Sequence, residues 1–164
     1  MRTVWAICCI AGLGLAGCGT DAESDPAPTP EVEEESNELN CGGPTSAERY
    51  YDGISKVSES GRYTVTLVAS DPAPPSKGDN VVTVQVTQND TPIDDMKVEV
   101  APFMPHHDHG TAPARYDGVL LDTGDLFEVP PFYLFMPGYW EYTVTLTGAD
   151  GDTDQAVFAF CVDG

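Results

Sequence analysis

Apolar and polar residues alternate with a period of two through much of this chain. In the stretch that begins at Trp140, aromatic and aliphatic residues hold every second position up to Leu146, and mostly threonine stands between them. Strict alternation with many β-branched and aromatic residues is typical of strands with one buried face. The pattern predicts strands over residues 62–69, 81–87, 96–101, 140–147 and 158–162.

Turn-forming residues separate these stretches. Clusters of Asp, Pro, Asn and Gly stand at 71–75, 89–92 and 150–152, and such clusters mark loops between strands. No segment from residue 61 onward has a sustained helical period, although residues 46–58 are compatible with one short helix. Several short strands with this punctuation predict an all-β fold, an Ig-like antiparallel β-sandwich of about seven strands.

The N-terminus has the features of an export signal. Arg2 precedes an uncharged apolar run over residues 4–15, which has the length of a signal-peptide core and is too short to span a bilayer. The run leads through Leu-Ala-Gly to Cys18 and resembles the bacterial lipobox, where cleavage precedes a cysteine that receives lipid. Residues 1–17 are therefore predicted to be a lipoprotein signal peptide, with Cys18 anchored in the membrane. The alternative is an ordinary secretory signal with a chance cysteine.

The segment after Cys18 has the composition of a spacer. Residues 18–40 are rich in Glu, Asp, Pro, Ser and Thr, so they cannot bury enough apolar surface to fold and are predicted to form an acidic disordered tether. Residues 41–164 then form the sandwich. Gly19 is not the aspartate that holds many such lipoproteins at the inner membrane, so the lipobox resemblance implies the bacterial outer membrane, facing the periplasm.

The charge of the chain excludes some partners. It has 27 acidic and 7 basic residues, a formal net charge of −20. Nucleic-acid binding depends on Lys and Arg that neutralise phosphates, so no nucleic-acid partner is expected. Anionic lipid would also repel this surface, so we expect the lipid on Cys18 to make the membrane contact.

The cysteines agree with export. Of five cysteines, Cys8 and Cys9 leave with the signal and Cys18 is consumed by lipid, which leaves Cys41 and Cys161. An even remainder in an oxidising compartment predicts a disulfide between them. Two free thiols that act as metal ligands are the competing interpretation.

The histidines indicate a metal site. All three lie within four positions of the segment MPHHDHG, residues 104–110. Neutral imidazole is the commonest protein ligand for copper, zinc and nickel. Alternate residues of an extended chain point to one side, so His107 and His109 are expected to meet one ion, while His106 points away unless the backbone turns. The alternative is a polar loop whose histidines face water.

Sulfur near these histidines favours copper. Met104 and Met136 offer soft thioethers, and soft sulfur combined with imidazole favours copper, especially Cu(I), over magnesium or calcium. Asp108 is a candidate hard ligand or a partner to a histidine. Met136 is equally compatible with a place in the core, where methionine often fills gaps.

Three aspartates at alternate positions hint at calcium. Asp150, Asp152 and Asp154 have the opening spacing of an EF-hand loop, which also needs glycine at its sixth position and glutamate at its twelfth. Those positions hold Gln155 and Cys161. The sequence predicts a hairpin turn here rather than a calcium site.

Residues 74–162 resemble the YtkA-like domain, a small β-sandwich of exported bacterial proteins related to FixH-type and CopC-like modules. The matching pieces are Lys-Gly-Asp-Asn, Thr-Pro-Ile, Met-Pro-His-His-Asp-His-Gly and Phe-Met-Pro-Gly-Tyr-Trp-Glu, at residues 77–80, 91–93, 104–110 and 135–141.

The resemblance implies copper handling in the cell envelope. Met104, His107, His109 and Met136 match its suspected ligands, and His106 falls on a variable position. Asp108 replaces the usual glycine between the two histidines.

These observations predict a lipid-anchored envelope protein that binds copper, as Cu(I) or Cu(II), and buffers it or passes it to an envelope partner protein. The other function class is a metal-free Ig-like module that docks on another envelope protein. We expect no enzyme, because the sequence shows no catalytic constellation and a Ser-His-Asp triad would have to use the histidine loop.

Overall fold

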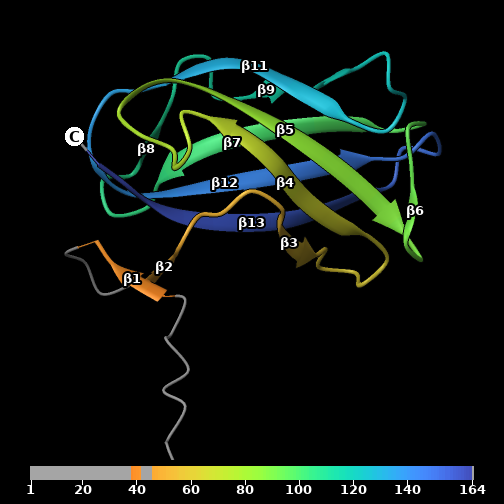
Figure 1. Ribbon diagram of the computed structural model, residues 1–164, viewed down its shortest axis with the longest axis horizontal. Coiled ribbons are helices and arrows are strands. Elements are labelled where there is room, and N and C mark those ends of the chain that lie inside the picture. Colours follow the sequence, from red (N-terminus) through yellow and green to blue (C-terminus); the bar gives the residue numbers. More distant parts are fainter. Residues whose placement is uncertain (1–37, 42–45, 164) are drawn as a thin grey trace, which may run out of the picture. The chain divides into compact units, whose positions relative to one another are not determined.

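The computed structural model describes residues 38–41 and 46–163 of the chain (Figure 1). The predicted signal peptide, the lipidation of Cys18 and residues 18–37 of the predicted tether lie outside the described residues. The last three residues assigned to the tether, Glu38–Asn40, form a strand instead, because they pair with residues 46–48. The described part contains no helix, and so none that is long and apolar enough to cross a membrane.

The larger sheet has the strand order β1, β2, β13, β12, β7, β8, and β9 also pairs with β7. Its long strands β7, β12 and β13 are antiparallel, whereas β2 joins β13 in parallel. The bounds of these strands are β1 (Glu38–Asn40), β2 (Ser46–Glu48), β7 (Lys97–Met104), β8 (His109–Gly110), β9 (Tyr116–Asp117), β12 (Gly138–Thr147) and β13 (Thr153–Val162).

The smaller sheet has the order β10, β11, β5, β4, β3, with β6 paired to β5. All of its pairs are antiparallel. Figure 1 shows β4 and β5 crossing in front of β7 and β12 of the larger sheet. The bounds are β3 (Ile54–Val57), β4 (Thr64–Asp71), β5 (Gly78–Gln88), β6 (Thr91–Pro92), β10 (Val119–Leu120) and β11 (Phe127–Leu134).

The predicted all-β sandwich is confirmed, but the prediction of about seven strands is too low. The described residues form sheets of seven and six strands. The extra strands are short, and β6, β8, β9 and β10 have two residues each. Alternation cannot be recognised over two residues, so only the long strands are visible in the sequence.

The expectation of a short helix over residues 46–58 is wrong. The segment contributes β2 to the larger sheet and β3 to the smaller one. Ile54 is buried opposite Leu67 of β4. Pairing of β2 with the remote strand β13 and of β3 with the next strand, β4, therefore outweighs the weak local helical preference of this segment.

The core lies between the two sheets, on the faces that the alternation predicts. In β12, Trp140, Tyr142, Val144 and Leu146 are buried, while the threonines between them are half-buried. Alternate residues of β5, from Val82 to Val86, are buried on the facing sheet. This apolar contact is the main stabilising interaction of the fold.

A disulfide closes the described domain. Cys41 and Cys161 are bonded, with their Cα atoms 5.4 Å apart and a sequence separation of 120, so the predicted pairing is confirmed. In the chain-entropy model a loop of this length contributes about 4–5 kcal/mol. The bond attaches the chain near β1 and β2 to β13, next to Tyr139, which is the register partner of Cys161.

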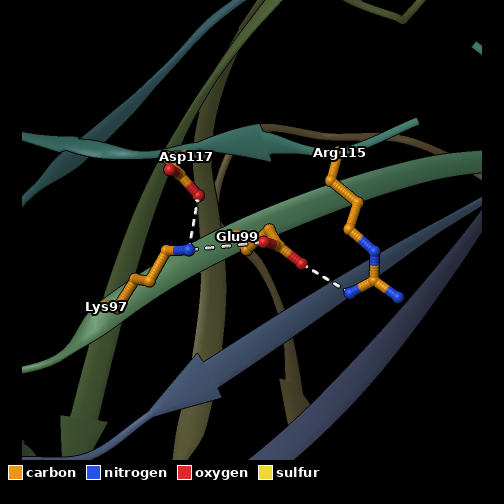
Figure 2. Close-up of polar contacts among 4 residues, drawn as sticks. All are labelled: Lys97, Glu99, Arg115 and Asp117. Carbon is orange, nitrogen blue, oxygen red and sulfur yellow. Dashed lines mark hydrogen bonds and ion pairs between the residues drawn. The ribbon is translucent and has the colours of Figure 1, made fainter. Parts of the chain in front are cut away.

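A group of ion pairs fixes the segment before β10 on the outer face of β7 (Figure 2). Lys97 Nζ lies 2.9 Å from Asp117 and 3.5 Å from Glu99, whose other oxygen lies 2.6 Å from Arg115 Nη1. Arg115 and Phe103 also line a groove of about 570 Å3 on this face. Exposed pairs of this kind contribute little each, about 0–1 kcal/mol, so the group orients the segment more than it stabilises the fold.

The three alternating aspartates belong to a hairpin turn, as predicted. β12 and β13 pair up to Thr147 and Thr153. The carboxylate of Asp154 is buried and accepts hydrogen bonds from the hydroxyl and backbone N–H of Ser60. Desolvation raises its pKa, but hydrogen bonds from Ser58, Ser60 and Gln155 outweigh that effect and lower the pKa to about 2.

Candidate metal centre

The histidines lie in a tight turn between β7 and β8. The turn covers residues 105–108, and the N–H of His107 donates to the carbonyl of Met104 over 3.1 Å. Asp108 has φ = 53°, in the left-handed region that short polar residues tolerate. Glycine adopts this conformation freely and aspartate tolerates it, so the turn accepts Asp108. The sequence predicted an extended chain through His107 and His109, but the structure has a hairpin turn there.

The hairpin places Met104 directly opposite His109. The two residues are register partners in the antiparallel pair of β7 and β8, and directly opposite side chains lie on the same face of a sheet. Met104 is buried on the core side and His109 is half-buried beside it. A side chain at Gly110 would place its Cβ 2.8 Å from the carbonyl oxygen of Pro102, so only glycine allows this close pairing.

The structure brings His107 and His109 together. Their ring centroids are 5.7 Å apart, close enough for small movements to let both imidazoles bind one ion. His106 lies elsewhere, because its ring stacks on Tyr139 with the centroids 5.0 Å apart. Tyr139 packs beside the disulfide, away from the core.

The side chain of Tyr139, on which the ring of His106 stacks, is an uncharged phenol. Burial, followed by a hydrogen bond of 3.0 Å from its hydroxyl to Glu141, raises the pKa of Tyr139 to about 12. The phenol therefore remains protonated at physiological pH.

The Met136-Pro137-Gly138 segment meets this hairpin. Gly138 has φ = +129°, and a Cβ at this position would lie 3.0 Å from the terminal methyl carbon of Met104. The position therefore requires glycine both for its backbone and for the methionine that packs on it. The two motifs, remote in the sequence, lie at one end of the larger sheet.

The side chain of Met136 is half-buried and packs against the core, and its carbonyl accepts a 3.0 Å hydrogen bond from Trp140 Nε1.

Two aromatic rings border His109. The centroid of the Phe135 ring is 4.8 Å from that of His109, and the centroid of the Trp140 ring is 6.0 Å from it. The sequence predicts Trp140 in a strand and places both rings in the segment 135–141 that carries the family resemblance, but it gives neither ring a role beside the histidines. Their position in the same Phe-Met-Pro-Gly-Tyr-Trp segment as Met136 was the available signal.

One ring nitrogen of His109 has no partner. Nδ1 is buried and has no hydrogen bond, although a buried polar nitrogen without a partner costs about 1–3 kcal/mol. A metal ion bound to this nitrogen would remove that cost. Among the described residues, no three His, Cys, Asp or Glu side chains gather to hold a metal ion, so a complete coordination shell here would need the thioethers.

These features define the class of protein: an all-β sandwich with paired imidazoles and a buried methionine at one end. The model of the YtkA-like family matches residues 58–145, which include both the histidine hairpin and the Met-Pro-Gly segment. The chain belongs to the YtkA-like family. No curated protein and no solved structure matches it.

Proposed function

We propose that this protein binds copper through His107, His109, Met104 and Met136, and buffers the ion or passes it to a partner. The unpartnered, buried Nδ1 of His109 is the observation that carries the proposal. It identifies a nitrogen held ready for a ligand beside a second imidazole. Imidazole and thioether together favour copper among the biological metals.

The chemistry of the site is binding rather than turnover. The chain's own residues position two imidazoles, bury one thioether at Met104 and restrict water with the rings of Phe135 and Trp140. The only chemistry that bound copper would supply is the exchange of its ligands when it passes from this protein to a partner. We therefore propose no enzymatic activity.

The proposed location is the bacterial cell envelope. The lipobox at Cys18 supports a lipid anchor, and the acidic composition of the residues that follow supports a tether. The oxidising compartment that this implies agrees with the Cys41–Cys161 disulfide. A tethered site would reach an envelope partner near the membrane at a high effective concentration, which favours transfer of an ion.

The test is titration with Cu(I) and Cu(II), separately, of the purified full chain in mild detergent. Wild type is compared with the double variant His107→Ala/His109→Ala and with His106→Ala, whose ring stacks on Tyr139. The double variant should bind copper at least ~100-fold more weakly, since losing a ligand costs more than losing its hydrogen-bond partner. His106→Ala should bind like wild type. Equal binding by wild type and the double variant would refute the proposal.

A metal-free docking module is the second candidate. β10 is an edge strand, and its Val119 and Leu120 are 62% and 40% exposed. Exposed apolar edges of sheets are common protein-binding surfaces. If docking is the function, Val119→Ser/Leu120→Ser will abolish association with an envelope partner while the double histidine variant leaves that association intact.

A further inference from the structure

We infer that the aromatic wall of the site, Phe135 and Trp140, makes it selective for a soft monovalent cation, Cu(I) or its stable analogue Ag(I), over divalent ions. This inference rests on the proposed function. It assigns a specificity role to two residues that donate no ligand atom.

The ligands proposed for the site carry no charge. Imidazole and thioether are neutral, and in the described residues no three His, Cys, Asp or Glu side chains gather to hold an ion. The carboxylate of Asp108, in the same turn, is exposed to water, which screens its charge. The nearby Glu141 is held by the hydroxyl of Tyr139, on the opposite face of β12 from Trp140. The cost of moving an ion out of water grows with the square of its charge, so a divalent ion pays about four times the penalty of a monovalent one. A neutral, partly dry site therefore favours the single charge.

The acidic surface of the chain favours divalent cations instead, because a net charge of −20 attracts them more strongly than monovalent cations. Salt screens such attraction beyond about 8–10 Å. The long-range field therefore raises the local concentration of all cations, while the groups beside His109 decide which one is retained.

Those groups are aromatic. Phe135 and Trp140 meet edge to face, with their centroids 5.9 Å apart and their planes at 89°, and both border His109. Trp140 is fully buried and its indole is held by the Met136 carbonyl, so its ring cannot turn away. Ring faces attract cations that have lost their water. Neutral zinc sites, in contrast, usually keep a coordination position for water when they are not closed by four ligands, and these rings restrict that water.

The first experiment compares ions on the full chain. Ag(I), Cu(I), Cu(II) and Zn(II) are titrated in detergent while tryptophan fluorescence is followed. Trp5 lies in the predicted signal peptide, so Trp140 is the sole tryptophan of the processed chain. Ag(I) and Cu(I) should bind at least ~100-fold more tightly than Zn(II) and quench Trp140. Tight binding of Cu(II) or Zn(II) at the Ag(I) level would overturn the inference and leave metal binding intact. Absence of binding by every ion would refute the proposed function itself.

The second experiment tests whether the aromatic wall contributes to ion selectivity. Phe135→Leu removes a ring that is 44% exposed, so folding should be unaffected. Phe103→Leu is the matched control, because Phe103 is 37% exposed and lies next to Met104 on the outer face of the same sheet. Phe135→Leu should weaken Ag(I) binding by about 2–5-fold and leave Zn(II) binding unchanged, whereas Phe103→Leu should change neither. An equal loss for both ions, or no loss for Ag(I), would overturn the specificity role.

Discussion

The two ends of the larger sheet are both polar hairpins, and they differ in what their polar atoms still have to bind. At one end, the carboxylate of Asp154 is surrounded by donors from Ser60 and Gln155. At the other end, Nδ1 of His109 is buried with no partner. Both segments have a spacing that suggests metal ligands. Of the two, only the second holds a buried side-chain atom without a hydrogen-bond partner. The identity and spacing of candidate ligands therefore have to be considered together with the hydrogen bonds that their atoms already make.

His109→Leu should separate a metal-binding role of this histidine from a structural one. The variant should lose copper affinity at least ~100-fold, because a ligand is gone. In the metal-free protein it should keep or gain stability by up to ~1 kcal/mol, since the unsatisfied Nδ1 is gone as well. Copper titration and chemical denaturation measure the two effects. A strong loss of stability without metal would mean that His109 is a structural residue.

A substitution at the other end of the sheet, at Asp154, should lower stability and leave copper binding unchanged. Asp154→Asn should lower the free energy of unfolding by roughly 2 kcal/mol, because the folded protein stabilises the ionised carboxylate. Its copper affinity should equal that of wild type. Reduced copper binding in this variant would show that the two ends are coupled.

The same carboxylate predicts a pH dependence. The pKa of Asp154 is about 2 in the folded protein, below its ordinary value. The stability from this group is therefore fully present above the unfolded pKa and is lost as the pH falls from about 4 to 2. Denaturation curves of wild type and Asp154→Asn should converge over this interval. Curves that remain parallel would contradict the assignment.

The glycines at the two ends give a matched pair. In Gly138→Ala the new methyl meets the buried Met104 at a positive φ, so we expect a loss of about 1–2 kcal/mol and a several-fold loss of copper affinity. In Gly148→Ala the nearest atom, 2.9 Å away, is a side-chain oxygen of the exposed Asp150, which can move. That control should cost less and leave copper binding unchanged. Similar copper affinities in the two variants would remove Met104 from the site.

The smallest expected effect concerns Asp108. The residue is exposed and has a left-handed φ that Asn also adopts. Asp108→Asn should leave Cu(I) affinity within about twofold, because the loss is one screened surface charge. A loss comparable to that in His109→Leu would make Asp108 a ligand.

Much of this molecule follows from local chemistry that a sequence displays. The period of two fixed which residues of β12 face the core, since successive side chains of a strand point to opposite faces. Subtracting the cysteines of the predicted signal peptide and the predicted lipid anchor identified Cys41 and Cys161 as a pair. The clustering of the histidines in residues 104–110 located the candidate site.

Other features depend on pairing between remote segments, which no local pattern contains. β2 replaced part of the expected helix because β13, far along the chain, supplied its pairing partner, while β3 pairs with the next strand, β4. Likewise, only the folded sheets separate His106, stacked on Tyr139, from His109 beside Phe135 and Trp140. The long strands, the disulfide and the residue types of the candidate site can be predicted from local sequence. Which polar atoms find partners cannot, because burial and hydrogen bonding depend on neighbours that meet only when the chain is folded.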